Sequence, residues 1–192
     1  MTSFKAYLDT SVLVAYGLGS DDIHYKGAKT VINDILQGNY IGVVSLLALL
    51  ETMDVIRKRI VDKTPKDILD GKSDTQKKEY VQQESRKRYQ ELIDKLTKAA
   101  KAKKILLVEH DGTNIADVLV TCHNMLTKEF GDIKLYHRCL QCGSDHEHYS
   151  YKGIGPIDAM HFVLAKKVPC QIFITTDKSF ASLNGEIHVS II

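Results

Sequence analysis

In FKAYLDTSVLVAY, residues 4–16, a short apolar run stops at an acid and is followed at once by a second apolar segment. The run from Phe4 to Leu8 has the length of a buried strand, and Thr10 to Tyr16 suits a helical turn after it. Three more apolar runs predict strands, and a run near the end of the chain is a fifth candidate. These runs are Tyr40–Val44, Ile105–Val108, Gln171–Thr175 and Ile187–Ile191.

Helical patterns separate the predicted strands. Ala28, Val31, Ile32 and Ile35 recur at three- and four-residue steps, which predicts an amphipathic helix over residues 23–37. Strands that alternate with helices are typical of a parallel sheet. We therefore predict an α/β fold in which helices cover both faces of a parallel central sheet. The other predicted helices span residues 46–60, 75–104, 113–128 and 156–167.

The composition is that of a globular protein. Of 192 residues, 44% are hydrophobic and 26% are charged, which excludes disordered and collagen-like chains. The longest purely apolar run, Leu46–Leu50, is too short to span a membrane. The length predicts a single domain over residues 1–192, with a basic helical insertion at about 62–104 and a Cys/His-rich loop insertion at about 132–153. Four cysteines and no signal-peptide core favour the reducing cytoplasm.

Basic residues are concentrated in one segment. Residues 57–104 hold 16 of the 26 Lys and Arg residues but only 8 of the 24 Asp and Glu residues. This segment has a net charge of +8, and the remainder of the chain has −6. An acidic body with a basic segment favours a polyanionic partner such as RNA. A lysine-rich helix face exposed to solvent would produce the same pattern.

Four acids are expected at one edge of the sheet. Asp9 follows the first strand directly, and Asp177 follows the fourth. Glu51 lies two turns into the helix after the second strand, and Asp158 lies in the first turn of the last helix. Ligands of open α/β sheets bind beyond the carboxyl ends of the strands. Taken singly, each acid could be a turn or cap residue, so their shared placement is what indicates a site.

Carboxylates gathered in this way repel one another, and some of them would stay protonated. A divalent cation removes this cost. A donor set made only of oxygens favours Mg²⁺ or Mn²⁺, which keep several waters and bind few carboxylates directly. Such a site suits hydrolysis of a phosphodiester bond, because the cation stabilises the charge that develops on the phosphate oxygens.

Four segments of the chain resemble, in order, the four acidic motifs of PIN-domain nucleases. The two most specific contain Asp-Ala-x-His-x-x-x-Ala from Asp158 and Thr-x-Asp-x-x-Phe around Asp177. The resemblance covers the sheet and its main helices, but not residues 62–88 or 132–153. The four segments are AYLDTSVLVAY (6–16), VVSLLALLE (43–51), GPIDAMHFVLAKK (155–167) and IFITTDKSF (172–180).

The resemblance implies a PIN-like fold and a Mg²⁺- or Mn²⁺-dependent ribonuclease, commonly a homodimer. Many small members of the family are toxins of the VapC type, which have an antitoxin protein as partner, and others process or degrade RNA. By motif position, the four acids above correspond to the metal-binding catalytic acids. Ser11 and Thr176 correspond only to supporting hydroxyls.

Two other functions fit part of the pattern. A non-catalytic RNA-binding or ribosome-associated module would use the basic helix as its surface, but it would be expected to lack a core acid, and all four are present. A phosphatase or phosphoryl-receiver domain would have adjacent acids after the first strand, whereas Asp9 is followed by Thr10 and Ser11. A PIN-domain ribonuclease is therefore the leading hypothesis.

Charged side chains near these acids have separate interpretations. Arg57, Lys58 and Arg59 extend the helix after the second strand toward the basic segment, and they are the first candidates for contact with RNA phosphates. Asp54 is expected to be a solvated helix acid. His161 is expected to form a structural hydrogen bond to a nearby carboxylate rather than to hold water or phosphate.

A Cys/His-rich segment raises the question of zinc. It contains a C-x₂-C pair followed by two histidines, which could bind a structural Zn²⁺ but not the catalytic metal, because thiolates select a softer ion. The four ligands would lie within ten residues, which is tight, and His137 or Cys122 could replace one of them. A polar loop with free thiols or a redox pair is the alternative. The four candidate ligands are Cys139, Cys142, His146 and His148.

Overall fold

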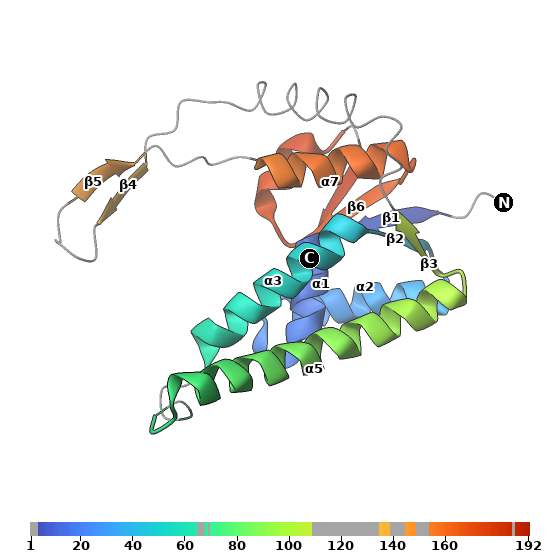
Figure 1. Cartoon of the computed structure of the whole chain (residues 1–192). Coiled ribbons are helices and arrows are strands. Elements are labelled where there is room, and N and C mark those ends of the chain that lie inside the picture. The colour runs from blue at the N-terminus through green and yellow to red at the C-terminus, as the bar shows by residue number, and fades with distance from the viewer. Residues whose placement is uncertain are drawn as a thin grey trace.

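A five-stranded parallel sheet forms the centre of the molecule (Figure 1). The computed structural model describes residues 4–64, 68, 70–108, 135–138, 145–148, 154–185 and 187–192. The strand order is β3-β2-β1-β6-β7, and every neighbouring pair is parallel, as predicted. The strands are β1 (Lys5–Leu8), β2 (Ile41–Ser45), β3 (Ile105–Val108), β6 (Ile172–Thr175) and β7 (His188–Ile191).

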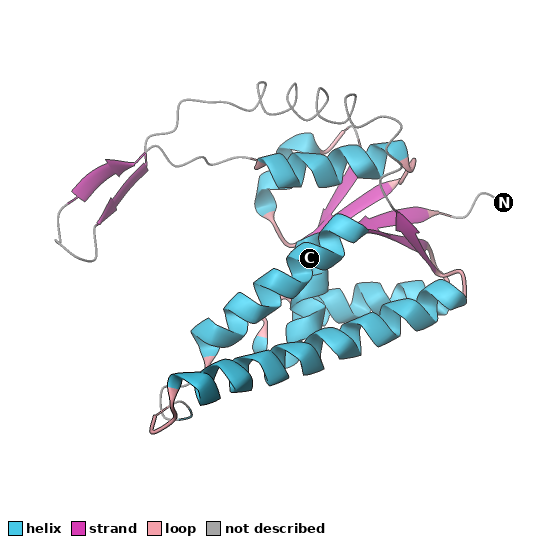
Figure 2. Cartoon of the chain, viewed as in Figure 1, coloured by secondary structure: helices cyan, strands magenta, loops and turns pink. Residues whose placement is uncertain are grey.

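Helices cover both faces of this sheet, which confirms the predicted α/β class (Figure 2). One face is covered by α7, and the other by α1, α2 and α5, while α3 begins at the end of β2 and packs against α1 and α5. The helices are α1 (Thr10–Leu18), α2 (Tyr25–Gln37), α3 (Leu46–Lys63), α5 (Asp74–Lys101) and α7 (Pro156–Lys167), with short 3₁₀ helices η1 (Gly19–Asp21) and η3 (Lys178–Leu183).

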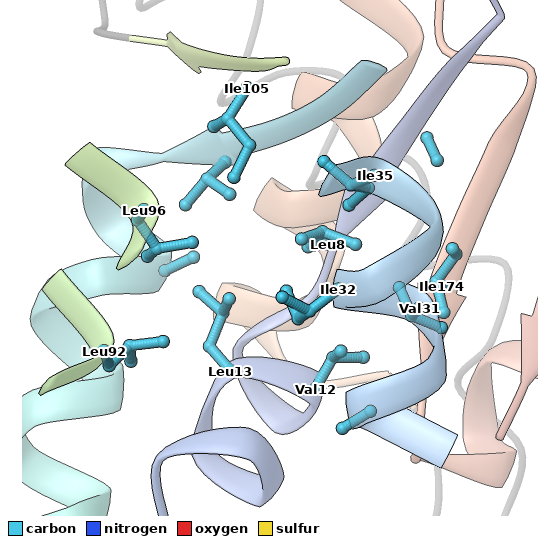
Figure 3. Packing of buried hydrophobic residues seen from close by; sticks show 14 of the residues in the cluster. Leu8, Val12, Leu13, Val31, Ile32, Ile35, Leu92, Leu96, Ile105 and Ile174 are labelled. Atoms are coloured by element: carbon cyan, nitrogen blue, oxygen red, sulfur yellow. The ribbon is translucent and has the colours of Figure 1, made fainter. Parts of the chain in front are cut away.

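The side chains of each strand alternate between two apolar cores, because successive residues of a strand point to opposite faces. On the α1 and α2 side, Leu8 and Ile174 pack with Ile32, Ile35 and other aliphatic residues (Figure 3). On the α7 side the core is aromatic. Its rings belong to Tyr7, Phe162, Phe173 and Phe180.

Local capping explains where the helices begin and end. Ser45 accepts a hydrogen bond from the Ala48 amide and so caps α3, which begins at Leu46. Ser73 and Gln76 form a capping box that starts α5. At the end of α2, Gly38 has φ of 90°, a left-handed conformation that favours glycine.

The helices α3 and α5 lie side by side and extend away from the sheet as an arm (Figure 1). A third apolar cluster, which includes Leu18, Ile56 and Ile60, joins them to α1. The long basic helix α5 has an apolar stripe, since Leu92 and Leu96 are buried against the sheet side of the molecule. None of the helices that the structure describes has the length and apolar character needed to cross a bilayer.

The prediction of a Cys/His-rich loop without regular structure was wrong in part. Within residues 132–153 the chain forms two antiparallel strands, β4 (Leu135–Arg138) and β5 (Asp145–His148). Their polar sequences lack the alternation of apolar and polar residues by which strands are usually recognised. The helix predicted over residues 113–128 lies outside the described residues.

Candidate active site

Asp9 lies at the carboxyl end of the central strand. Its backbone amide donates to the Ile174 carbonyl at 3.0 Å, which ties the end of β1 to β6. Its side chain caps α1 by accepting from the backbone amide of Ser11. Its Oδ2 also accepts from the hydroxyls of Ser11, at 2.6 Å, and Thr175, at 2.9 Å. Asp9 is only 4% exposed, so these donors fix the orientation of its carboxylate.

Thr175 connects Asp9 to Asp177. Its hydroxyl donates to Asp9 and accepts from the backbone amide of Asp177 at 2.9 Å. The Asp177 carboxylate then caps η3. Thr176, which the resemblance placed as a supporting hydroxyl, contributes its backbone amide, which donates to the Ser11 hydroxyl at 2.9 Å. Ser11 and Thr175 therefore supply the two hydroxyls that contact Asp9.

Asp158 approaches the same edge of the sheet from α7. Its Oδ2 accepts from the Gly155 amide at 2.9 Å and so caps the helix, whose first residue is Pro156. Burial raises the pKa of Asp158 above its ordinary value; the Gly155 hydrogen bond opposes this, and the charges of Asp9 and Asp177 raise the pKa further. Because Coulomb interactions weaken with distance, this effect places the Asp158 carboxylate on the same side of the sheet as Asp9 and Asp177.

Glu51 is held by two side chains from other helices. The Thr10 hydroxyl donates to Oε2 at 2.7 Å, and His161 Nε2 lies 2.6 Å from the same oxygen. Burial disfavours the charged carboxylate, but the hydrogen bonds from His161 and Thr10 outweigh it and lower the pKa of Glu51. The predicted hydrogen bond of His161 to a carboxylate is therefore confirmed, and Glu51 is ionised at neutral pH.

His161 is anchored on its other side. Its ring is buried, and Nδ1 lies 2.8 Å from the Tyr7 hydroxyl. That hydroxyl donates to Ser45 Oγ at 2.8 Å, and Ser45 caps the helix that carries Glu51. Burial raises the pKa of Tyr7, so the phenol keeps its proton. A chain of hydrogen bonds thus runs from the start of α3 through β1 and α7 back to Glu51.

Three residues of this site were not predicted from the sequence. Thr10 and Thr175 stand directly beside residues that were singled out, and a hydroxyl next to an acid at a strand end is a signal that could have identified them. Tyr7 lies inside an apolar run, where nothing distinguishes it from an ordinary core aromatic.

A family model of known proteins matches almost the whole chain. The model is that of the PIN domain, and it matches residues 6–186, a range that contains all four acids. The chain belongs to the PIN-domain family. PIN domains are nucleases, so the chain has the fold and motifs of a phosphodiester hydrolase.

The search of curated proteins gave no significant match to this PIN domain. Among solved structures, it is similar to VapC20 of Mycobacterium tuberculosis, a toxin described as cleaving the sarcin–ricin loop. The two sequences are 15% identical, the match covers 93% of this chain and 95% of the other, and the TM-score is 0.49.

The residues predicted to contact RNA divide between two cavities of the PIN domain's arm. Arg57 and Lys58 line a groove of about 700 Å³ between α3 and α5, together with Lys77 and Lys78. Arg59 lines a separate cavity of about 510 Å³ on the arm. The three cations therefore line two different cavities.

The charge of the first two cations is partly neutralised. Asp54 Oδ1 accepts from Arg57 at 2.7 Å, and its Oδ2 lies 2.6 Å from Lys58 Nζ. The hydrogen bond from Lys58 and the charges of both cations lower the pKa of Asp54. The prediction that Asp54 is a solvated helix acid is confirmed, since 40% of its side chain is exposed.

The zinc prediction cannot be placed on the structure. Cys139 and Cys142 lie outside the described residues, and for His146 and His148 only the backbone of β5 is described. The register of the hairpin pairs His146 with His137. A structural zinc in this segment stays a prediction.

Proposed function

We propose that this PIN domain hydrolyses phosphodiester bonds of RNA with the help of Mg²⁺ or Mn²⁺. The observation that carries this proposal is the set of hydrogen bonds that join Asp9 to Asp177 through Thr175, and Glu51 through His161 to α7, the helix that begins with Asp158 in its first turn. An acid whose charged form is disfavoured by its acidic neighbours is one that a hard dication stabilises. Glu51 adds a fourth carboxylate, already ionised.

The donors fit a cation that keeps much of its water. They are all oxygens, which Mg²⁺ and Mn²⁺ prefer. Among the residues that the structure describes, no three His, Cys, Asp or Glu side chains form a group able to hold a metal ion by themselves. Mg²⁺ usually binds through one or two carboxylates and retains several waters. We therefore propose that the four acids hold the cation partly through water.

The side chains of the site have distinct tasks in this reaction. When bound, the dication polarises the phosphate and neutralises the charge on the leaving oxygen. The hydrogen bonds from Ser11 and Thr175 all end on Oδ2 of Asp9, so Oδ1 is the oxygen that would contact the cation or its water. Asp9 and Asp177 are the candidates for orienting the water that attacks phosphorus in line, with a 3′-hydroxyl leaving.

A nuclease assay with defined single-stranded RNAs tests the function. We expect cleavage with Mn²⁺ or Mg²⁺ and none with excess chelator. We also expect the dication to raise the melting temperature, because it binds the folded state and relieves carboxylate repulsion. Cleavage that persists in chelator would contradict the role of the metal. RNA that is bound but never cut would instead favour the non-catalytic binding module.

Charge reversal on the arm tests the RNA surface. In Arg57→Glu/Lys58→Glu we expect weaker RNA binding. We also expect the plot of log binding constant against log salt concentration to become less steep, by about 0.7 for each phosphate contact with single-stranded RNA that is lost. Affinities measured at several salt concentrations give this slope. The matched control is Lys26→Glu/Lys29→Glu on α2, which should leave affinity nearly unchanged. An unaltered slope in the arm variant would exclude the groove.

The partners implied by the family resemblance stay predictions. These are an antitoxin protein, a second copy of the chain in a homodimer, and with them the role of a toxin. The cytoplasmic location expected from the cysteine content is likewise untested. Co-purification from the native host would show whether a small partner protein accompanies the chain.

A further inference from the structure

We propose that Thr10 and His161 are positioning residues that act together as a clamp on Glu51. The clamp holds the Glu51 carboxylate beside the other three acids, so that all four belong to one site. The inference rests on the proposed metal-dependent nuclease function and assigns two residues to it. The Thr175 hydroxyl joins Asp9 to Asp177 by hydrogen bonds, whereas Glu51 lies on α3. Glu51 therefore needs a separate connection to the other acids.

The clamp provides this connection from two directions. Thr10 directly follows Asp9, and His161 lies one helical turn after Asp158 on α7. Both contact the same oxygen, Oε2 of Glu51, at 2.7 and 2.6 Å. The position of Glu51 is thus set relative to Asp9 by one contact and relative to Asp158 by the other.

Thr10 and His161 both contact Oε2 of Glu51, so Oε1 remains for contact with a cation or its water. Among the described residues, Oε1 of Glu51 has no hydrogen-bond partner. The Glu51 side chain is 26% exposed, whereas that of His161 is 1% exposed. Glu51 therefore presents a partly exposed carboxylate whose rotation is restricted.

The His161 end of the clamp is rigid for a reason visible in the core. Its Nδ1 contacts the hydroxyl of Tyr7, and the Tyr7 ring stacks on Phe173 with centroids 5.3 Å apart and planes 6° apart. Tyr7 and Phe173 are fully buried. Residues that orient metal-binding side chains from behind commonly change metal affinity by 10- to 100-fold when they are lost.

The test measures Mn²⁺ affinity by calorimetry, the melting temperature, and RNA cleavage. We expect Thr10→Val and His161→Leu each to weaken Mn²⁺ binding about tenfold or more. His161→Gln should recover much of this loss, because its amide nitrogen can donate to Glu51. The matched control is Thr52→Val on α3, which removes a buried hydroxyl that donates to the Ala48 carbonyl and should leave Mn²⁺ affinity unchanged.

The deciding measurement repeats the two clamp substitutions in a Glu51→Gln background. Residues that act through Glu51 should then have no further effect on Mn²⁺ affinity, because coupled residues are not additive. An equal loss in both backgrounds would overturn the clamp while leaving the proposed function standing. A wild-type chain that folds but does not bind Mn²⁺ would overturn both.

Discussion

Asp158→Asn is expected to abolish Mn²⁺-dependent RNA cleavage and, in the metal-free protein at neutral pH, to raise the melting temperature. We expect cleavage to fall at least about a thousandfold, or roughly 4 kcal/mol of transition-state stabilisation. The asparagine side-chain oxygen can still accept from the Gly155 amide, so the cap of α7 is kept. What disappears is a carboxylate charge that burial, Asp9 and Asp177 all disfavour.

The sign of the stability change follows from proton linkage. Because the pKa of Asp158 is raised on folding, the folded state holds the Asp158 proton more tightly than the unfolded state does. Stability therefore falls as the pH rises from the ordinary pKa of an aspartate through the raised pKa of Asp158. The advantage of the variant should therefore be largest at neutral pH and shrink as the pH falls toward the usual pKa of an aspartate. Thermal melts across this pH range measure it.

Two companion variants complete this experiment. Asp9→Asn should abolish cleavage to a similar extent. The matched control is Asp34→Asn, because Asp34 lies near the end of α2, where it accepts from Asn39, before β2 begins. It should cleave RNA like the wild type. Full activity in both Asp9→Asn and Asp158→Asn would reject the proposed site.

Phe173→Ala is expected to lower the free energy of unfolding by about 3–5 kcal/mol. Phe173 is fully buried in the core under α7, and its ring contacts those of Tyr7, Phe162 and Phe180 at centroid distances of 5.3, 5.5 and 4.7 Å. The substitution removes these contacts and leaves a cavity. A loss of this size is a large share of the roughly 5–15 kcal/mol by which domains are usually stable.

Urea unfolding measures this effect, and Phe173→Leu is its control. Leucine retains much of the buried apolar volume, so it should cost clearly less than alanine. A loss below about 1 kcal/mol in Phe173→Ala would show that the core can collapse around the missing ring. It would also contradict the rigid anchoring of Tyr7 behind His161.

The sequence predicted the sheet and the helix boundaries well where local chemistry determines them. The last helix begins at Pro156 and ends at Lys167, as predicted, because proline suits the first turn and the Asp158 side chain caps it. The strand at Ile105–Val108 was also predicted to the residue. The placement of the acids after parallel strands followed from topology alone, since all carboxyl ends meet at one edge.

What the sequence could not predict depends on contacts between distant segments. The connection from Ser45 through Tyr7 to His161 joins residues more than a hundred positions apart, and no local pattern marks it. The separation of Arg57 from Arg59 is different, because residues two apart on a helix do not face one another. Helical geometry alone would have indicated that they line different cavities.

The hydrogen bonds between the end of β1 and β6 have a consequence for how the site assembles as the chain is synthesised. Asp9 emerges early in synthesis, yet its partners Ile174 and Thr175 are near the end of the chain. Because Thr175 holds the Asp9 carboxylate, the proposed acid site is complete only once the segment that contains Thr175 has been synthesised and has packed against β1. Under the proposed function, an incomplete chain that lacks this segment would therefore not cleave RNA.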